Sequence, residues 1–102
     1  MQVLVFGAGY SGQAIGANIL AHGKAAAGTT RSADKLAELG GRGITPYIYS
    51  GENFSPELRR AMRTTTHLVQ SIPPGAEGDS VLRLTGRDLE KWFPALTWVG
   101  YL

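Results

Sequence analysis

The chain has 102 residues, 43% of them hydrophobic and 18% charged, with a formal net charge of +2 and no cysteine. This length suits one small folded domain and is too short for a cofactor domain together with a separate substrate domain. The lack of cysteine excludes disulfides, thiolate metal sites and cysteine nucleophiles. Because the two histidines are isolated as well, we expect no metal site.

The charge and hydropathy patterns do not indicate binding to nucleic acids or membranes. A local basic cluster, Arg59, Arg60 and Arg63, contains no interleaved aromatic residue and has the spacing of a solvated helix face. No stretch resembles a secretory signal or reaches the length of a membrane span. We therefore expect a cytoplasmic protein that binds neither nucleic acid nor membranes.

The first part of the chain alternates between strand and helix patterns. In chain order, the residues predict a strand over 2–6, a helix over 12–22, a strand over 24–30 and a helix over 31–41. Gly23 is expected to end the first helix in a left-handed conformation. Ser32 can cap the second helix, which Gly40 and Gly41 are expected to stop.

The alternation continues to the last residues. The residues predict a strand over 43–50, a helix over 53–63 and a strand over 66–75. A helical segment over 80–93 and a strand over 96–102 follow. Pro46 removes a ladder donor and places its strand at a sheet edge. Ser55 caps the next helix with Pro56 at its first position, Asp79 can cap the following segment, and Gly86 is expected to break that segment in two.

This order of elements predicts one α/β domain over residues 1–102. Strands that alternate with helices imply right-handed crossovers and a parallel sheet covered on both faces. The expected fold is a Rossmann-like doubly wound sheet with strand order 3-2-1-4-5. The last strand would then lie at an open edge and expose Trp98, Val99 and Tyr101, so we expect that edge to be covered by further chain or by self-association.

The segment "GAGYSG" joins the first strand to the first helix and has the spacing of a dinucleotide-binding loop. Gly7 would allow the tight turn, Gly9 the close approach of a pyrophosphate, and Gly12 the packing of helix on strand. The amides of Tyr10, Ser11 and Gly12 would point at the phosphates. The alternative is a glycine-rich turn that binds no ligand.

The end of the second strand predicts which dinucleotide is bound. An acidic residue there would bind the ribose hydroxyls of NAD, but this chain has Thr30, Arg31 and Ser32. Arginine and hydroxyl groups can donate hydrogen bonds to the 2′-phosphate that a carboxylate would repel. The sequence therefore favours NADP over NAD, unless Arg31 only begins the next helix in solvent.

Together, "VLVFGAGYSGQAIGANIL", "GTTRS" and "HLVQSIPPGAEGD" resemble the extended or atypical short-chain dehydrogenase/reductase superfamily, in particular its NAD-dependent epimerase/dehydratase-like proteins. The resemblance covers essentially the whole chain. It implies that the loop after the fourth strand lines the adenine and ribose side of the cleft. The residues that the resemblance assigns to the cofactor are Gly7, Gly9, Tyr10, Ser11, Gly12, Thr30, Arg31, Ser32, Ser71, Ile72 and Pro73.

The chain departs from that superfamily in its catalytic residues. The glycine spacing matches the atypical branch, and no tyrosine of the chain begins the Tyr-x-x-x-Lys pair that the family uses. We therefore assign no catalytic residue and expect the chain to be the amino-terminal part of a longer protein or an incomplete gene model.

Three functions are compatible with these residues. The first is the NADP-binding part of an oxidoreductase, epimerase or dehydratase, in which the nicotinamide supplies the hydride chemistry. The second is a non-catalytic module that senses NADP and signals by association. The third is a truncated product without function.

Overall fold

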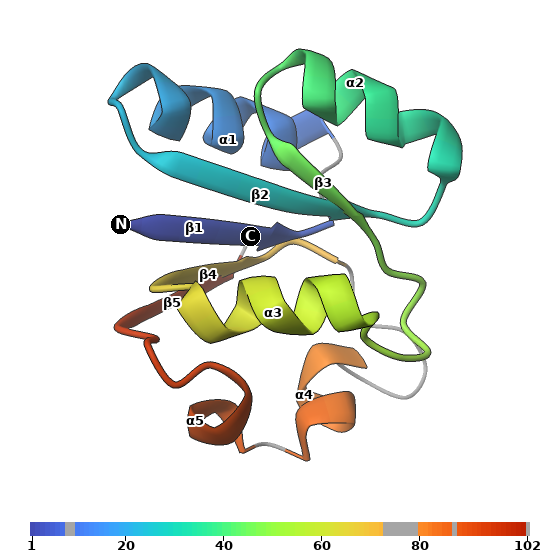
Figure 1. The fold of residues 1–102 in the computed structure, drawn as a ribbon, viewed down its shortest axis with the longest axis vertical. Helices are drawn as coiled ribbons and strands as arrows, with labels where there is room; N and C mark the ends of the chain where they lie inside the picture. Colours follow the sequence, from blue (N-terminus) through green and yellow to red (C-terminus); the bar gives the residue numbers. More distant parts are fainter. Residues whose placement is uncertain (8–9, 73–79, 87, 102) are drawn as a thin grey trace.

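The computed structural model describes residues 1–7, 10–72, 80–86 and 88–101. Figure 1 shows its strands and helices. The strands are β1 (Gln2–Phe6), β2 (Ala25–Thr30), β3 (Thr45–Ile48), β4 (His67–Gln70) and β5 (Trp98–Tyr101). The helices are α1 (Tyr10–Ala21), α2 (Leu36–Gly41), α3 (Pro56–Thr64), α4 (Ser80–Thr85) and α5 (Leu89–Trp92), with a 3₁₀ turn at Ala33–Lys35 before α2.

The strands form one sheet in the order β3-β2-β1-β4-β5, and every pair is parallel. This confirms the predicted Rossmann-like fold and the edge position of the strand that contains Pro46. From β1 the chain runs outward through β2 to β3, and α3 then returns it to the other side of β1. The strand order therefore reverses between β1 and β4.

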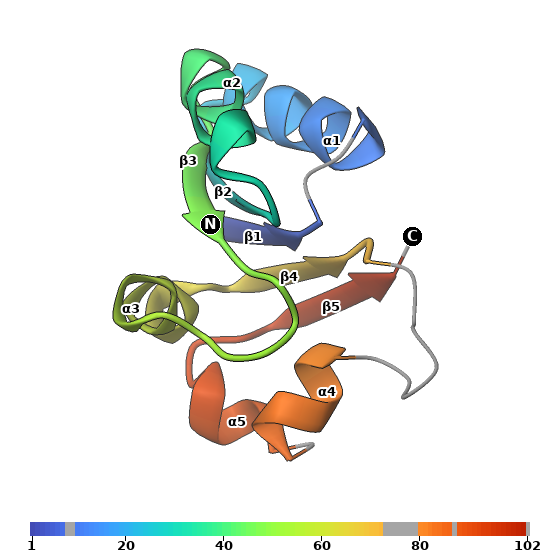
Figure 2. The ribbon, with the colours of Figure 1, turned by 90° about the vertical axis from the view of Figure 1, so that its right-hand side faces the viewer.

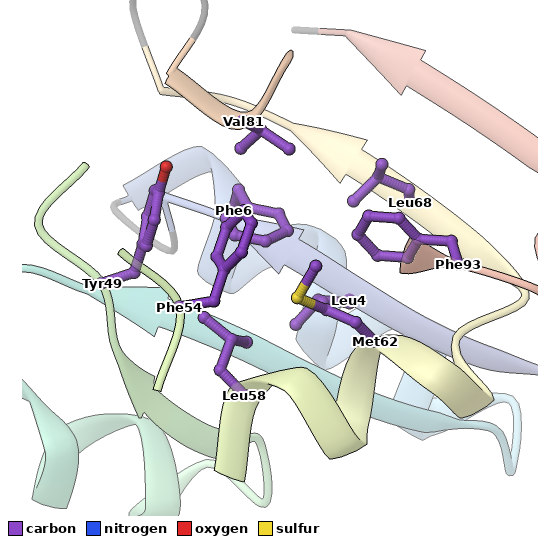
Figure 3. Packing of buried hydrophobic residues seen from close by; sticks show 9 residues of the cluster. All are labelled: Leu4, Phe6, Tyr49, Phe54, Leu58, Met62, Leu68, Val81 and Phe93. Carbon is purple, nitrogen blue, oxygen red and sulfur yellow. The ribbon is translucent and has the colours of Figure 1, made fainter. Parts of the chain in front are cut away.

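Helices cover both faces of the sheet. Figure 2 shows α1 and α2 over one face and α3, α4 and α5 over the other. Successive side chains of β1 point to opposite faces, so Val3 and Val5 pack toward α1 while Leu4 and Phe6 join the larger core. Figure 3 shows that larger core, whose buried members are Leu4, Phe6, Tyr49, Phe54, Leu58, Met62, Leu68, Val81 and Phe93.

Local signals set several helix ends as predicted. The Ser55 hydroxyl accepts a hydrogen bond from the amide of Leu58 at 3.1 Å, and Pro56 occupies the first turn of α3. Gly23 and Gly86 have left-handed φ values of 74° and 64°, so α1 ends and the α4–α5 segment breaks where the sequence indicated. Asp79 lies outside the described residues. Within the described part of the chain, no helix has the length and apolar character needed to cross a bilayer.

The second helix ends at Gly41, as predicted. Gly40 and Gly41 lie inside α2, and Arg42 caps it. Gly43 supplies the left-handed residue instead, with φ of 80°, and its amide donates to the carbonyl of Gly40 at 2.9 Å. α2 therefore ends at its two glycines, and the left-handed residue that closes the turn lies just beyond them, at Gly43.

The exposure predicted for β5 is partly correct. Trp98 is 52% exposed and Tyr101 is 61% exposed. Val99 is only half-exposed because it packs against the larger core. Its side chain lies on the sheet face opposite to that of Trp98, as strand alternation requires, so the expectation that Val99 is exposed is wrong.

Candidate functional site

The carboxyl ends of β1 and β4 lie side by side at the point where the strand order reverses. Phe6, the last residue of β1, is in register with Gln70, the last residue of β4. In open parallel sheets, ligands bind in the crevice outside such strand ends. The segments that follow these two strands are therefore the candidate ligand-binding site.

Hydrogen bonds from two neighbouring strands hold the turn after β1. Gly7 has a φ of 83°, and its amide donates to the Thr29 hydroxyl of β2 at 2.9 Å. The Ser71 hydroxyl, just after β4, donates to the carbonyl of Phe6 at 2.9 Å and also contacts the carbonyl of Gly7. The peptide groups on both sides of Gly7 are thus fixed by side chains far away in the sequence.

The turn also leaves no room for a side chain at position 7. A Cβ atom on Gly7 would lie 2.8 Å from Cγ1 and 3.1 Å from the backbone nitrogen of Ile72. The Ile72 amide in turn donates to the side-chain oxygen of buried Gln70 at 2.9 Å. Gln70 therefore fixes the loop after β4 directly against the glycine turn.

α1 begins immediately after this turn. Tyr10, Ser11 and Gly12 form its first turn, and Figure 2 shows that this end of α1 faces the carboxyl edge of the sheet. The first amides of a helix have no partner inside the helix and carry its partial positive charge, which favours an anion. Gly9 and Pro73, also predicted as site residues, lie outside the described residues.

The residues at the end of β2 make local hydrogen bonds. The Thr30 hydroxyl accepts from the amide of Ser32 at 3.3 Å, and the Ser32 hydroxyl accepts from the amide of Asp34 at 3.2 Å. Arg31 is exposed, and its guanidinium donates to the carbonyl of Ser50 at 3.3 Å. Arg31 therefore already has a protein acceptor at the end of β3.

The sequence did not predict the roles of Thr29, Gln70 and Gly16. Thr29 and Gln70 are buried polar side chains at strand ends, and both fix the backbone of the crevice. Gly16 is buried, and a Cβ atom there would lie 2.7 Å from Cδ1 of Ile44. The sequence signal for Thr29 is its hydroxyl near the end of a strand made mostly of alanine and glycine, which indicates a buried hydrogen-bonding role.

Comparisons with known proteins show the fold of the chain. No protein-family model and no curated protein matches it. A functionally unknown conserved protein from Silicibacter pomeroyi matches 98% of the chain at 29% identity with a TM-score of 0.77. An engineered reductase used in asymmetric catalysis matches 99% at 21% identity with a TM-score of 0.77. The TrkA-N domain of the inner membrane protein ybaL from Escherichia coli matches 97% at 20% identity with a TM-score of 0.72.

The same structures differ in how much of their own length they share with this chain. The chain spans 33% of the Silicibacter protein and 36% of the reductase, but 70% of the TrkA-N chain. These likenesses support the Rossmann-like fold and show that it occurs both within longer chains and in a chain not much longer than this one.

Proposed function

We propose that the chain is an NAD(P)-binding Rossmann module that prefers NADP and serves as the amino-terminal cofactor-binding part of a longer reductase-like protein. The observation that carries the proposal is the turn at Gly7, which lies where the strand order reverses and has no space for a Cβ atom. This turn leads into α1, whose first amides are suited to a pyrophosphate.

The residues at the crevice fit a dinucleotide. Gly7, Gly9 and the first turn of α1 would hold the pyrophosphate, and the segment from Ser71 to Pro73 would line the cleft beside it. Thr30, Arg31 and Ser32 would meet the 2′-phosphate, and none of these three carries a carboxylate to repel it. When bound, the nicotinamide would supply hydride chemistry, while this chain would orient the cofactor.

The reductase likeness supports the catalytic version of the proposal. The structural match covers 99% of this chain and about a third of the engineered reductase. The resemblance of the glycine and "GTTRS" segments to short-chain dehydrogenases/reductases supports the same version. On this proposal the catalytic groups come from outside residues 1–102, so the chain alone binds cofactor without turning over substrate.

The TrkA-N likeness favours a second candidate, a non-catalytic NADP-sensing module. The chain spans 70% of that structure, so a fold of this size is not confined to large enzymes. The two candidates share the same cofactor site and differ in what the bound cofactor does.

Titration calorimetry with NADP and NAD tests the shared part of the proposal. We expect saturable binding of one dinucleotide per chain and a clear loss of affinity in Gly9→Val, because a side chain there intrudes on the pyrophosphate. Gly41→Val serves as the control, since a Cβ atom at Gly41 has no neighbour within 4 Å. Failure of the wild-type chain to bind either dinucleotide would refute the proposal.

A further inference from the structure

The outer edge of β5 presents backbone groups to which no described strand pairs. Among the described residues β5 pairs only with β4, and Figure 2 shows it at the outside of the sheet. The Trp98 amide donates to the carbonyl of Thr66, on the side of β4, at 3.2 Å. The backbone groups of successive residues in a strand point to alternate sides. The amide and carbonyl groups of Val99 and Tyr101 therefore point outward, away from β4.

The edge at the other end of the sheet is less suited to pairing. Just after β3, the Tyr49 amide donates to the carbonyl of Thr30 at 2.9 Å, so the backbone groups of Ile48 and Pro46 point outward. Proline has no amide hydrogen to donate, and Pro46 therefore interrupts this edge. A head-to-tail sheet, in which β5 of one chain joins β3 of the next, is disfavoured for this reason. Contact between two β5 strands meets no such obstacle, because β5 contains no proline.

The residues around β5 also allow two copies to meet. No charged residue occurs from Trp92 to Leu102, so like charges do not face each other across such a contact. Natural sheet edges are commonly protected by lysine or proline, and β5 has neither. Trp98 and Tyr101 instead expose large rings there. Both the backbone and the side chains of this edge therefore favour a second copy of the same edge.

Gly100 shapes the face of β5 that carries Trp98. A Cβ atom on Gly100 would overlap the Trp98 ring, so the indole covers this glycine. The indole also stacks against His67 of β4, with ring centroids 6.2 Å apart. The Trp98 ring is thus held over the middle of β5, beside the open edge.

We propose that β5 pairs antiparallel with β5 of a second copy of this chain, about a two-fold axis at Gly100. An axis perpendicular to the sheet keeps each sheet face on its own side, so Val99 lies opposite Tyr101 of the second copy. Their outward groups exchange both hydrogen bonds of an antiparallel pair, once on each side of the axis. The two Gly100 residues form the close pair between them, and the two Trp98 rings meet above that pair.

The neighbouring symmetric register suits these groups less well. An axis at Val99 would place Tyr101 opposite Thr97 of the second copy. The amide and hydroxyl of Thr97 already donate to the carbonyl of Thr66, at 2.8 and 3.1 Å. The axis at Gly100 uses only groups that point outward. Because four-residue strands form a small contact, we expect a dimer that dissociates on dilution.

Disulfide trapping tests this register, because the chain has no cysteine of its own. The Cα atoms of a hydrogen-bonded antiparallel pair are about 5.5 Å apart, within reach of a disulfide. We therefore expect a mixture of Val99→Cys and Tyr101→Cys chains to form a linked dimer under mild oxidation. In either variant alone the cysteines would be diagonal neighbours about 7 to 8 Å apart, beyond that reach.

The control mixture combines Val99→Cys with Ile48→Cys. Ile48 is exposed on β3 at the opposite edge, so this mixture should link no faster than chance collisions allow. Faster linkage of Val99→Cys with itself than with Tyr101→Cys would place the axis elsewhere and overturn the proposal. Equal linkage in the test and control mixtures would overturn it as well.

A second pair of variants separates backbone pairing from contact between exposed rings. Tyr101→Pro loses the outward amide, whereas Tyr101→Thr loses the ring but keeps the amide. The symmetric dimer uses this amide twice, so Tyr101→Pro should weaken dimerisation about ten- to a hundredfold more than Tyr101→Thr does. Sedimentation equilibrium measures the dissociation constants, and circular dichroism checks that both variants are folded.

Equal dissociation constants for the proline and threonine variants would show that the edge does not pair through its backbone. A wild-type chain that stayed monomeric at every concentration would also overturn the inference. The pairing goes beyond the proposed function and needs no cofactor, so its failure would leave the dinucleotide site untouched.

Discussion

The hydroxyl of Thr29 accepts the amide hydrogen of Gly7 at 2.9 Å and so joins the end of β2 to the glycine turn after β1. Thr29 is only 1% exposed, and water therefore has little access to replace this bond. The turn that begins the candidate cofactor loop depends on a residue 22 positions away in the sequence.

Replacing Thr29 with valine should destabilise the fold. Valine keeps the shape of threonine but cannot accept the hydrogen bond, so the Gly7 amide loses its acceptor, at a cost of about 1 to 3 kcal/mol in the free energy of unfolding. Urea denaturation followed by circular dichroism measures this difference. Thr29→Ser keeps the hydroxyl and should lose less. If valine and serine variants were equally stable, the hydrogen bond to Gly7 would have no net effect.

Replacing Gly7 with alanine should be more harmful than the same change at Gly23. Both residues have positive φ values, 83° and 74°. The left-handed conformation of either alanine should therefore lower the free energy of unfolding by about 1 kcal/mol or more. At Gly7 the new Cβ atom also meets the backbone nitrogen of Ile72 at 3.1 Å, whereas at Gly23 it meets nothing within 4 Å. The unfolding midpoints in urea should therefore rank wild type, Gly23→Ala and Gly7→Ala.

The dinucleotide affinity of the same two variants gives a separate readout. Gly23→Ala lies at the far end of α1 and should bind cofactor as the wild type does. Gly7→Ala displaces Ser71 and Ile72, which lie against the turn. This variant should therefore bind cofactor more weakly even where it is fully folded in the absence of denaturant. Equal affinities would separate the Gly7 turn from the cofactor site.

The sheet order and the glycine turn could be read from the sequence because both depend on local patterns. The alternation of strands and helices predicted the order that the structure shows, and "GAGYSG" predicted a turn between β1 and α1. Contacts between distant residues could not be read in this way. Nothing next to Thr29 in the sequence shows that its hydroxyl holds the amide of Gly7, 22 positions away.

The wrong expectation for Val99 has the same origin, as do two details that the sequence did not show. Gly40 and Gly41 end α2 as predicted, and the sequence pattern did not show that Gly43 completes the turn in a left-handed conformation. The partial burial of Val99 depends on which face of β5 it occupies and on the core that reaches that face. The contact of Arg31 with the Ser50 carbonyl, which lies beyond the next helix in the chain, could not be read from local patterns either.

The outer edge of β5 should cause the chain to self-associate. Among the described residues β5 pairs only with β4, and Trp98 and Tyr101 expose large rings beside the open edge. Strands with exposed edges and apolar side chains pair with other chains. Sedimentation velocity over a range of concentrations should show association that the double variant Trp98→Lys, Tyr101→Lys reduces. Ile48→Lys is the control, because Ile48 is exposed on β3 at the opposite edge of the sheet. A wild-type chain that remained monomeric at all concentrations would contradict this expectation.

Replacing Arg31 with glutamate should reverse or abolish the preference for NADP. A charge-assisted contact with the 2′-phosphate is worth about 1.5 to 3 kcal/mol, which corresponds to roughly tenfold to a few hundredfold in affinity. The side chain is exposed and donates to Ser50, so part of this gain is offset and we expect the lower end of the range. Glutamate removes the contact, repels the phosphate and offers an acceptor to the ribose hydroxyls of NAD.

Titrations of both cofactors into the wild type and Arg31→Glu, at matched ionic strength, measure the NADP to NAD affinity ratio. Arg42→Glu is the control for the change of charge, because Arg42 is exposed at the end of α2. The Arg31 variant should lower the ratio at least tenfold relative to this control, and the difference should shrink as salt is added because the contact is exposed to solvent. Thr30 and Ser32 can still donate neutral hydrogen bonds to the phosphate, so some NADP binding should remain. An unchanged ratio in Arg31→Glu would remove Arg31 from the cofactor site and assign its guanidinium to the Ser50 carbonyl alone.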